Sequence, residues 1–228
     1  MTNGTDLVVV DYRLGNLFNV VRACESVGLP SRITSLPADV AGADAVILPG
    51  VGAFGDAMEF LRDSGMADAL RSFAASGRPL LAICLGMQLL MTESYEFGRH
   101  QGLGVVGGSV IRLNSPAGLK VPQVGWNRIA KLATANGQAN GQSNSQSWDG
   151  TLLQGLRDGE YMYFVHSYYV VPDDSGVVLT TTRYGETEFC STLRAGNILG
   201  CQFHPERSGP QGLRIYQQLA EYLKTAGQ

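Results

Sequence analysis

The sequence predicts an α/β fold with a mostly parallel central sheet, helices on both faces, and added antiparallel strands in the second half. In the first half, short apolar runs alternate with segments whose apolar residues recur every three or four positions, which is typical of strands alternating with helices. In the second half, strand-like runs follow one another with turn residues between them and little helix. We interpret residues 1–228 as a single domain.

The expected strands of the first half are short apolar runs over 6–11, 31–34, 45–48 and 79–83. Helical spacing of apolar residues occurs over 16–27, 56–74 and 84–91. Strand patterns of the second half cover 105–113, 161–171, 177–183, 189–194 and 198–203, and a last helix covers 209–223. The segment 132–150 is rich in Asn, Gln, Gly and Ser, so we expect a mobile surface insertion there.

Composition excludes several classes of function. The formal net charge is -3 and no run of like charge occurs, which argues against nucleic acid or an anionic membrane as the main partner. The N-terminal stretch has no basic region and its apolar run is far shorter than the ~20 residues of a membrane span, so we expect the cytoplasm. The four cysteines form no CxxC pair and the three histidines do not cluster with them, so no metal site and no cofactor are expected.

Cys84 is the candidate nucleophile. It lies where the strand 79–83 passes into a helix without a spacer, and a helix N-terminus favours the thiolate form of cysteine. Gly86 leaves room for a sharp turn, as in a nucleophile elbow, although Ala82 stands in place of the first glycine of that motif. A buried structural cysteine remains the alternative, so the interpretation requires a base.

His204 and Glu206 are the candidate base and its orienting acid. Pro205 favours an extended conformation at His204, and in extended chain the side chains at i and i+2 point to the same side. Glu206 is therefore expected to hold the imidazole of His204 and to stabilise its protonated form. A structural histidine at the end of a strand is the alternative for His204 alone.

The glycine-rich segment Pro49-Gly50-Val51-Gly52 follows a strand and is a candidate oxyanion loop. Its glycines allow backbone N–H groups to point into a cleft at the carboxyl edge of the sheet, and the N–H of Leu85 is the expected second donor. Phosphate binding is the alternative, but the segment has neither a Walker lysine nor a G-x-G-x-x-G pattern.

These elements resemble those of the class I (triad-type) glutamine amidotransferases, a family with a flavodoxin-like fold. Within that family, they are similar in particular to the glutaminase subunits of imidazole glycerol phosphate synthase. The motifs are DYRLGNL from Asp11, LPGVGAFGDAM from Leu48, ICLGMQLL from Ile83, VPQVGWN from Val121, YFVHSYY from Tyr163 and GCQFHPERS from Gly200. The resemblance covers about residues 11 to 215.

The resemblance implies roles for individual residues. Cys84 would attack the carboxamide of L-glutamine to form a glutamyl thioester, and His204, oriented by Glu206, would protonate the departing ammonia and then activate water. The amides of Val51 and Leu85 would hold the oxyanion. Residues matching the family's contacts to the amino and carboxylate groups of glutamine are Gly52, Gln88, Glu96, Ser167 and Tyr168. His166 is by the same comparison not the base.

The resemblance also implies a heterodimer with a (β/α)8 cyclase subunit, which would use the ammonia in L-histidine biosynthesis. Residues matching the docking surface are Asn16, Gln123, Trp126, Asn127, Tyr163 and Arg207. The sequence departs from the family pattern in Gln123 for histidine, Arg207 for lysine, Arg13 for glycine, and in the long segment 132–150.

Three hypotheses follow from the sequence. The leading one is a glutaminase whose activity depends on the cyclase subunit. A second is another triad-type amidotransferase, or a cysteine hydrolase of similar fold acting on a different amide. A third is a binding or regulatory subunit that has kept the fold without the chemistry, which the presence of Cys84, His204 and Glu206 disfavours.

Overall fold

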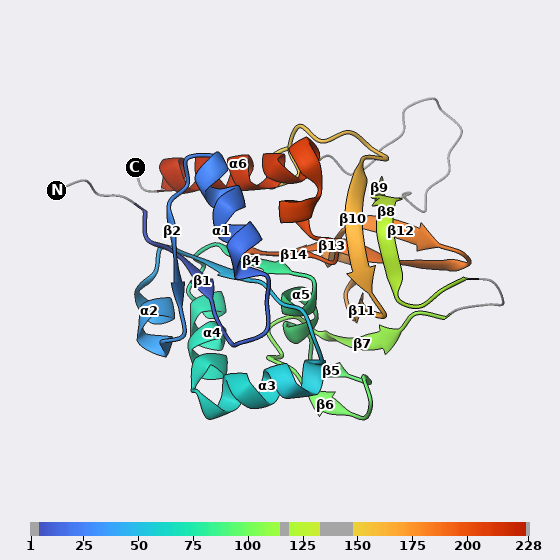
Figure 1. The fold of residues 1–228 in the computed structure, drawn as a ribbon, viewed down its shortest axis with the longest axis horizontal. Coiled ribbons are helices and arrows are strands. Elements are labelled where there is room, and N and C mark those ends of the chain that lie inside the picture. Colours follow the sequence, from blue (N-terminus) through green and yellow to red (C-terminus); the bar gives the residue numbers. More distant parts are fainter. Residues whose placement is uncertain (1–4, 115–118, 133–147, 227–228) are drawn as a thin grey trace.

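An eight-stranded sheet forms the centre of the chain in the computed structural model, which describes residues 5–114, 119–132 and 148–226 (Figure 1). Its strand order is β2-β1-β3-β4-β14-β13-β12-β9. The first five strands run parallel to one another, and the last three are added in antiparallel pairs. The predicted mixture of a parallel core with antiparallel additions is confirmed, and the order of the parallel strands is that of flavodoxin-like folds.

The parallel strands are β1 (Leu7–Val10), β2 (Ser31–Thr34), β3 (Ala45–Leu48), β4 (Leu80–Ile83) and β14 (Ile198–Cys201). Every residue of β1, β3, β4 and β14 is buried, because helices cover both faces of this part of the sheet. The antiparallel additions are β13 (Thr187–Ala195), β12 (Val178–Tyr184) and β9 (Ala130–Lys131).

Helices cover the two faces of the sheet, as predicted. One face packs against α1 (Leu17–Ser26) and α6 (Gly209–Ala226), and the other against α2 (Pro37–Gly42), α3 (Phe54–Asp63), α4 (Met66–Ala75) and α5 (Leu85–Leu89) (Figure 1). Alternate residues of β1 show the division, since Val8 and Val10 belong to one hydrophobic cluster and Leu7 and Val9 to the other.

Two small sheets lie beside the central one. In the first, β8 (Gln123–Arg128) pairs antiparallel with β10 (Tyr161–His166). The second contains β11 (Tyr168–Pro172), β7 (Gly108–Arg112), β5 (Glu93–Ser94) and β6 (His100–Gln101) in that order. Two short 3-10 helices, η1 (Ser175–Val177) and η2 (Pro205–Arg207), complete the described elements.

Three predicted elements differ from the structure. The helix expected over 56–74 is two helices, α3 and α4, because the chain turns at Gly65 with a φ of 75°, a conformation that glycine adopts readily. The strand expected over 161–171 is interrupted at Ser167, and its halves β10 and β11 join different sheets. The helix expected over 84–91 ends at Leu89.

Most of the expected insertion 132–150 lies outside the described residues, since the structure describes only Leu132 and residues 148–150 of it. Trp148 is buried in the core, and its indole N–H donates to the carbonyl oxygen of Leu179 at 3.3 Å. This tryptophan therefore fixes the end of the segment to the sheet. None of the helices in the described ranges has both the length and the apolar character that crossing a bilayer requires.

Candidate active site

Cys84 occupies a sharp turn between β4 and α5. Its backbone has φ 54° and ψ -109°, a region that residues other than glycine seldom adopt. The turn is held by the Cys84 N–H, which donates to the carbonyl oxygen of Cys201 at 2.7 Å, and by the Gln88 N–H, which donates to the carbonyl oxygen of Cys84 at 3.2 Å. A Cβ on Gly86 would collide with the carbonyl oxygen of Leu48, so glycine is required there. The geometry is that of a nucleophile elbow.

His204 reaches the same edge of the sheet from the neighbouring strand. Cys201, the last residue of β14, lies opposite Ile83, the last residue of β4, so the chain leaves both strands side by side. The His204 N–H donates to the carbonyl oxygen of Tyr163 at 2.9 Å, which fixes the loop against β10. The Ser208 hydroxyl adds a second link, because it donates to the carbonyl oxygen of His204 at 2.6 Å and accepts the N–H of Tyr163 at 2.9 Å.

Glu206 holds the imidazole of His204, but not in the way the sequence suggested. His204 is extended, whereas Pro205–Arg207 form the 3-10 turn η2, and this turn folds the carboxylate back onto the ring. The Nδ1 atom of His204 lies 2.8 Å from Oε1 of Glu206, and the two side chains are 7% and 2% exposed. The expectation of an extended i, i+2 alignment is therefore wrong, while the contact itself is present.

The charge state of His204 follows from its neighbours. Burial by itself lowers the pKa of this histidine, but the Cys84 sulfur, through charge and a side-chain hydrogen bond, and the Glu206 carboxylate together outweigh it and raise the pKa to about 10. The imidazole is therefore protonated at neutral pH, between a sulfur and a carboxylate. Such an arrangement places a positive charge beside the candidate nucleophile.

A cavity of about 260 Å³ opens in front of Cys84. This volume is at the small end of ligand pockets and suits one amino acid better than a nucleotide. All five residues expected to contact glutamine line it, as do both expected oxyanion residues. The lining consists of Val51, Gly52, Cys84, Leu85, Gln88, Glu96, Pro122, Val165, His166, Ser167 and Tyr168.

Two polar side chains of this cavity are fixed by the protein itself. The Gln88 amide donates one hydrogen to the carbonyl oxygen of Tyr168 at 2.8 Å and the other to Oε1 of Gln202 at 3.1 Å, which leaves Oε1 of Gln88 as its acceptor for a ligand. The Glu96 carboxylate accepts the N–H of Phe54, the first residue of α3, at 2.5 Å. A carbonyl oxygen and a carboxylate in one small cavity can bind an ammonium group.

The expected oxyanion donors are not both available in this structure. The Leu85 N–H donates to the carbonyl oxygen of Gly50 at 3.4 Å, so that carbonyl lies where an oxyanion would need to bind. Val51 is 42% exposed at the mouth of the cavity. An oxyanion site formed by these two amides therefore requires the peptide between Gly50 and Val51 to turn over.

His166 also lines the cavity. Its Nδ1 lies 2.9 Å from the carbonyl oxygen of Tyr168, and burial lowers the pKa of the ring to about 4. The ring is therefore neutral at pH 7 and packs edge-on against Phe189, with centroids 5.0 Å apart. A histidine in this environment is suited to a structural role.

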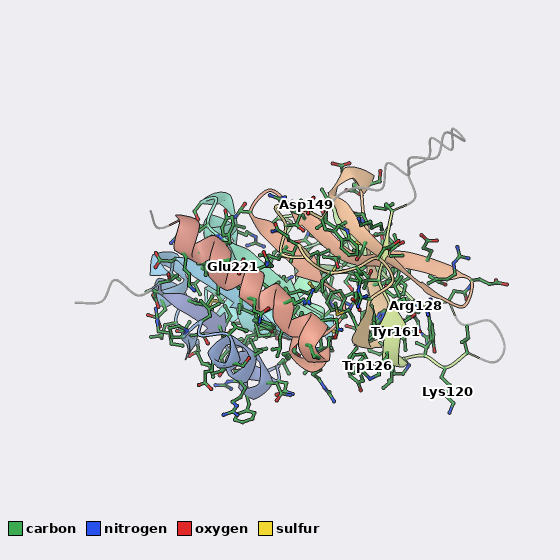
Figure 2. All side chains as sticks on the ribbon, turned by 90° about the horizontal axis from the view of Figure 1, so that it is seen from above. Lys120, Trp126, Arg128, Asp149, Tyr161 and Glu221 are labelled. Atoms are coloured by element: carbon green, nitrogen blue, oxygen red, sulfur yellow. The ribbon has the colours of Figure 1, made fainter. Side chains whose placement is uncertain are left out.

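Part of the expected docking surface is an exposed face of β8 and β10, shown with its labelled side chains in Figure 2. Trp126 is 55% exposed and its ring contacts Tyr163 edge-on, with centroids 5.9 Å apart. The Arg207 guanidinium lies 4.6 Å over the Tyr163 ring. These three side chains form one aromatic and basic cluster at the surface.

The other expected docking residues lie outside this cluster, although Gln123 and Asn127 belong to the same strand, β8. Asn16 is exposed at the start of α1, where its side chain accepts the N–H of Asn19 at 3.4 Å. Asn127 donates its side-chain amide to the carbonyl oxygen of Arg183 at 2.9 Å. Gln123 is only 3% exposed and points to the buried face of β8, opposite His166, so this structure does not present it at the surface.

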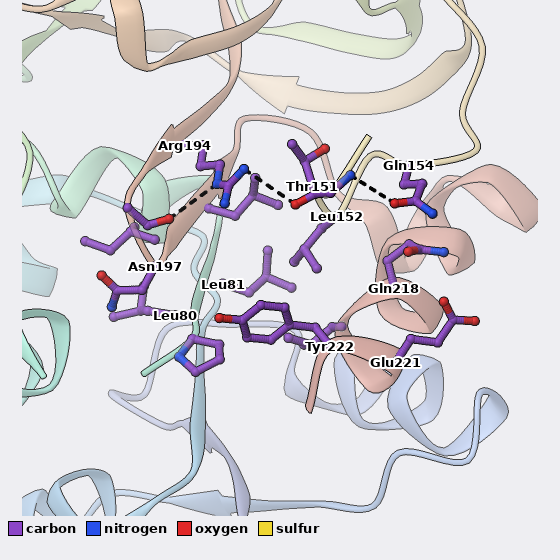
Figure 3. A pocket seen from close by; sticks show the side chains of 16 residues that line it. Leu80, Leu81, Thr151, Leu152, Gln154, Arg194, Asn197, Gln218, Glu221 and Tyr222 are labelled. Carbon is purple, nitrogen blue, oxygen red and sulfur yellow. Dashed lines mark hydrogen bonds between the residues drawn. The ribbon is translucent and has the colours of Figure 1, made fainter. Parts of the chain in front are cut away.

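A second cavity, of about 250 Å³, lies at the opposite, amino-terminal ends of β4 and β14 (Figure 3). Leu80, Leu152 and Tyr222 are among the side chains that line it, and Arg194 at its rim donates to the carbonyl oxygens of Gly196 and Gly150. No expected site residue lines this cavity. Across residues 5–114, 119–132 and 148–226, no group of three His, Cys, Asp or Glu side chains is arranged to hold a metal ion.

Sequence reasoning missed two residues whose hydrogen bonds hold the site together, although both lie in motifs that were singled out. Tyr12, in the first motif, donates its hydroxyl to the carbonyl oxygen of Pro49 at 2.6 Å. Gln202, two residues before His204, donates its amide toward the Cys84 sulfur at 3.8 Å. Both contacts join segments far apart in the chain, so residue spacing does not reveal them.

The fold and the cluster of Cys84, His204 and Glu206 define a triad-type amidotransferase, and comparison with known proteins agrees. The family model described as "Glutamine amidotransferase class-I" matches residues 8–221. Within that class the chain belongs to the family of the imidazole glycerol phosphate synthase subunit HisH. It is 44% identical to the HisH subunit of Aquifex aeolicus over 225 residues, covering 96% of this chain and 99% of that one.

Other comparisons are consistent with this family. The HisH subunit of Rhodopirellula baltica is 43% identical over 215 residues, covering 94% of this chain and 96% of the relative. Among solved structures, a glutamine amidotransferase superposes with a TM-score of 0.68 at 20% identity, covering 95% of this chain and 98% of the other. PurLQS from Thermotoga maritima gives a TM-score of 0.67 at 20% identity, covering 96% and 99%. At these identities the solved structures show the fold alone.

Proposed function

We propose that the chain is a glutaminase that hydrolyses L-glutamine to glutamate and ammonia with Cys84, His204 and Glu206 as its catalytic residues. The observation that carries the proposal is the buried pair of His204 and Glu206 beside a cavity of amino-acid size that Cys84 lines, with His204 near enough to the Cys84 sulfur for that sulfur to raise its pKa. Membership of the class-I glutamine amidotransferases supports the choice of substrate.

The geometry supports a two-step reaction. The Cys84 sulfur attacks the side-chain carboxamide carbon, and the C–N bond breaks as His204 gives its proton to the departing nitrogen, leaving a glutamyl thioester and ammonia. His204, now neutral, takes a proton from water, whose oxygen attacks the thioester carbon. The C–S bond then breaks, which restores the thiolate beside the newly protonated imidazole, and glutamate leaves after its acid proton passes to solvent. Gly52, Gln88, Glu96, Ser167 and Tyr168 hold the amino and carboxylate groups of the substrate.

The oxyanion of each step would be bound by the amides of Val51 and Leu85. The Leu85 N–H is donated to Gly50 in the present conformation, so catalysis at full rate requires the Gly50–Val51 peptide to reorient. Each such donor is worth on the order of 3 kcal/mol in the transition state. A subunit with this loop conformation is expected to be slow until a partner stabilises the reoriented loop.

The proposed partner is the cyclase subunit of imidazole glycerol phosphate synthase, as a heterodimer that receives the ammonia for L-histidine biosynthesis. The names of the relatives support this partner, and the cluster of Trp126, Tyr163 and Arg207 offers it an aromatic anchor. We place the complex in the cytoplasm. The four cysteines, none of which forms a disulfide, are compatible with a reducing compartment.

The test is glutamate and ammonia release from L-glutamine by the purified chain, with and without the cyclase subunit and its nucleotide substrate. We expect slow release by the chain alone and strong activation in the complex. The variant Cys84→Ala should abolish release, and a glutamine-derived diazo ketone should label Cys84. Full activity without any partner would point to a free-standing amidase, and absence of labelling at Cys84 would contradict the proposed chemistry.

A further inference from the structure

Gln202 connects the proposed nucleophile with the proposed substrate site. It lies between the end of β14 and His204, and it is fully buried, with an exposed fraction of 0%. Its Oε1 accepts an amide hydrogen of Gln88 at 3.1 Å, and its Nε2 lies 3.8 Å from the Cys84 sulfur. The Gln202 backbone is fixed as well, because its N–H donates to the carbonyl oxygen of Ser191 at 3.0 Å.

The direction of these hydrogen bonds is determined by one backbone group. The carbonyl oxygen of Tyr168 can only accept, so the amide nitrogen of Gln88, 2.8 Å away, must face it. The second hydrogen of that nitrogen then points to Gln202, which must present its oxygen there. The nitrogen of Gln202 is consequently left facing the Cys84 sulfur, as a donor.

A donor at this place suits the thiolate better than the thiol. The thiol form of Cys84 has a hydrogen to give, and the carbonyl oxygen of Val165 lies 3.7 Å from the sulfur to accept it. The thiolate has no hydrogen and needs donors. Among the described residues, His204 and Gln202 are the side chains that supply donors to this sulfur. Since hydrogen bonds to charged groups are stronger than those to neutral ones, the Gln202 amide stabilises the charged form.

We propose that Gln202 is a catalytic residue of this site with two functions: its N–H stabilises the Cys84 thiolate, and its Oε1 fixes the amide of Gln88 so that the Gln88 oxygen faces the substrate. The inference rests on the glutaminase function proposed above. It predicts that removing the amide of Gln202 weakens both ionisation of the nucleophile and binding of glutamine, whereas loss of Gln88 weakens binding directly and affects ionisation only by releasing the Gln202 amide.

Two measurements separate these functions. The first is the rate of Cys84 alkylation by iodoacetamide as a function of pH, on the full chain without glutamine or partner. Burial raises the pKa values of Cys24, Cys190 and Cys201, so these thiols compete little for the reagent. The second is the kcat and KM of glutamate release by the complex with the cyclase subunit.

The variants are Gln202→Leu, Gln88→Leu and a control, Thr182→Val. Thr182 is buried on β12 and its hydroxyl has no partner among the described residues, so valine replaces it without loss of a hydrogen bond. If Gln202→Leu does not fold, Gln202→Met is used in its place, because methionine has about the length of glutamine but no amide. Far-UV circular dichroism and thermal unfolding establish which variants fold.

For Gln202→Leu we expect the midpoint of the alkylation profile to rise by about one pH unit and the KM for glutamine to rise roughly tenfold. Because Cys84 and His204 interact strongly, this midpoint is an apparent pKa of the pair and not of Cys84 alone. Gln88→Leu should raise KM and shift the midpoint by less than Gln202→Leu does, because Gln202 loses its restraint but keeps its amide, and Thr182→Val should change neither. An unchanged midpoint in folded Gln202 variants, or an equal shift in the control, would overturn the proposal. Failure of the wild-type complex to release glutamate would refute the proposed function instead, without affecting the alkylation result.

Discussion

The hydroxyl of Tyr12 donates to the carbonyl oxygen of Pro49 at a distance of 2.6 Å, and both groups are buried. Pro49 directly precedes the Gly50–Val51 peptide, whose reorientation would free the Leu85 N–H for an oxyanion. The ring also leaves no room for a side chain at Gly50, because a Cβ there would collide with the tyrosine oxygen. Tyr12 therefore restrains the loop at the residue before the peptide that must move.

The first prediction concerns the variant Tyr12→Phe. We expect it to lower the free energy of unfolding by about 1–3 kcal/mol, because the Pro49 oxygen would be left buried without a donor. We also expect glutamate release by the chain alone to increase severalfold, because a restraint on the loop is removed. Urea unfolding and partner-free glutaminase assays measure the two effects.

The matched control is Tyr216→Phe. The Tyr216 hydroxyl is also fully buried, but it has no hydrogen-bond partner among the described residues, so its loss should cost less stability. An unchanged or lower partner-free rate in Tyr12→Phe would show that the tyrosine does not restrain the loop.

The second prediction concerns the turn at Cys84. The variant Gly86→Ala places a methyl group against the carbonyl oxygen of Leu48, a backbone atom that cannot swing aside. We expect a loss of more than about 2 kcal/mol of stability together with loss of glutaminase activity. Gly42→Ala is the control, since a Cβ there meets nothing within 4 Å, and alanine at the end of α2 should be neutral or slightly stabilising. Equal stability of the two variants in urea unfolding would contradict the required turn.

The third prediction is a dependence of stability on pH through His166. Burial lowers the pKa of this ring to about 4, whereas the unfolded chain has a histidine pKa near 6.5. Below pH 6.5 the unfolded state binds a proton that the folded state does not, so His166 reduces the free energy of unfolding as pH falls from 6.5 toward 4. At about 1.36 kcal/mol per pH unit, the loss approaches about 3 kcal/mol.

Comparison of wild type with His166→Gln isolates this contribution, because the carboxylates titrate in both proteins. We expect the wild type to lose stability more steeply between pH 6.5 and 4.5, and the two curves to run parallel above pH 7. Urea unfolding at half-unit pH intervals provides the measurement. Parallel curves over the whole range would mean that the folded ring binds its proton as readily as the unfolded one.

The strands that could be predicted from the sequence are those whose burial requires an unbroken run of apolar residues. The runs in β1, β3 and β4 were predicted because a strand covered on both faces needs apolar residues at every position. The strand β8 was missed because its residues, Gln123–Arg128, are polar on one side and carry an exposed Trp126 on the other. The break at Ser167 was missed because one histidine and one serine between two apolar runs do not by themselves mark the end of a strand.

The same distinction applies to the candidate site. Cys84, His204 and Glu206 could be found from motifs, because the residue types and the strand ends already indicate the chemistry. The contacts of Tyr12 with Pro49, and of Gln202 with Cys84, depend on which strands are neighbours in the sheet. The conformation of the Gly50–Val51 peptide depends on competing hydrogen bonds, which residue identity does not determine.

The last prediction concerns the proposed partner surface. Trp126 is half exposed although its ring packs on Tyr163, and the Arg207 guanidinium lies over the Tyr163 ring. These contacts fix the three side chains before a partner binds, so the cluster is preorganised. Trp126→Ala is expected to weaken binding of the cyclase subunit at least tenfold in calorimetric titration, with little change in the thermal stability of the free chain. Ile33→Ala is the control and should bind as the wild type does, because Ile33 is exposed on β2, the edge strand of the central sheet that lies away from β8 and β10 (Figure 1). If both variants bind equally well, the cyclase docks elsewhere and the aromatic cluster requires a different explanation.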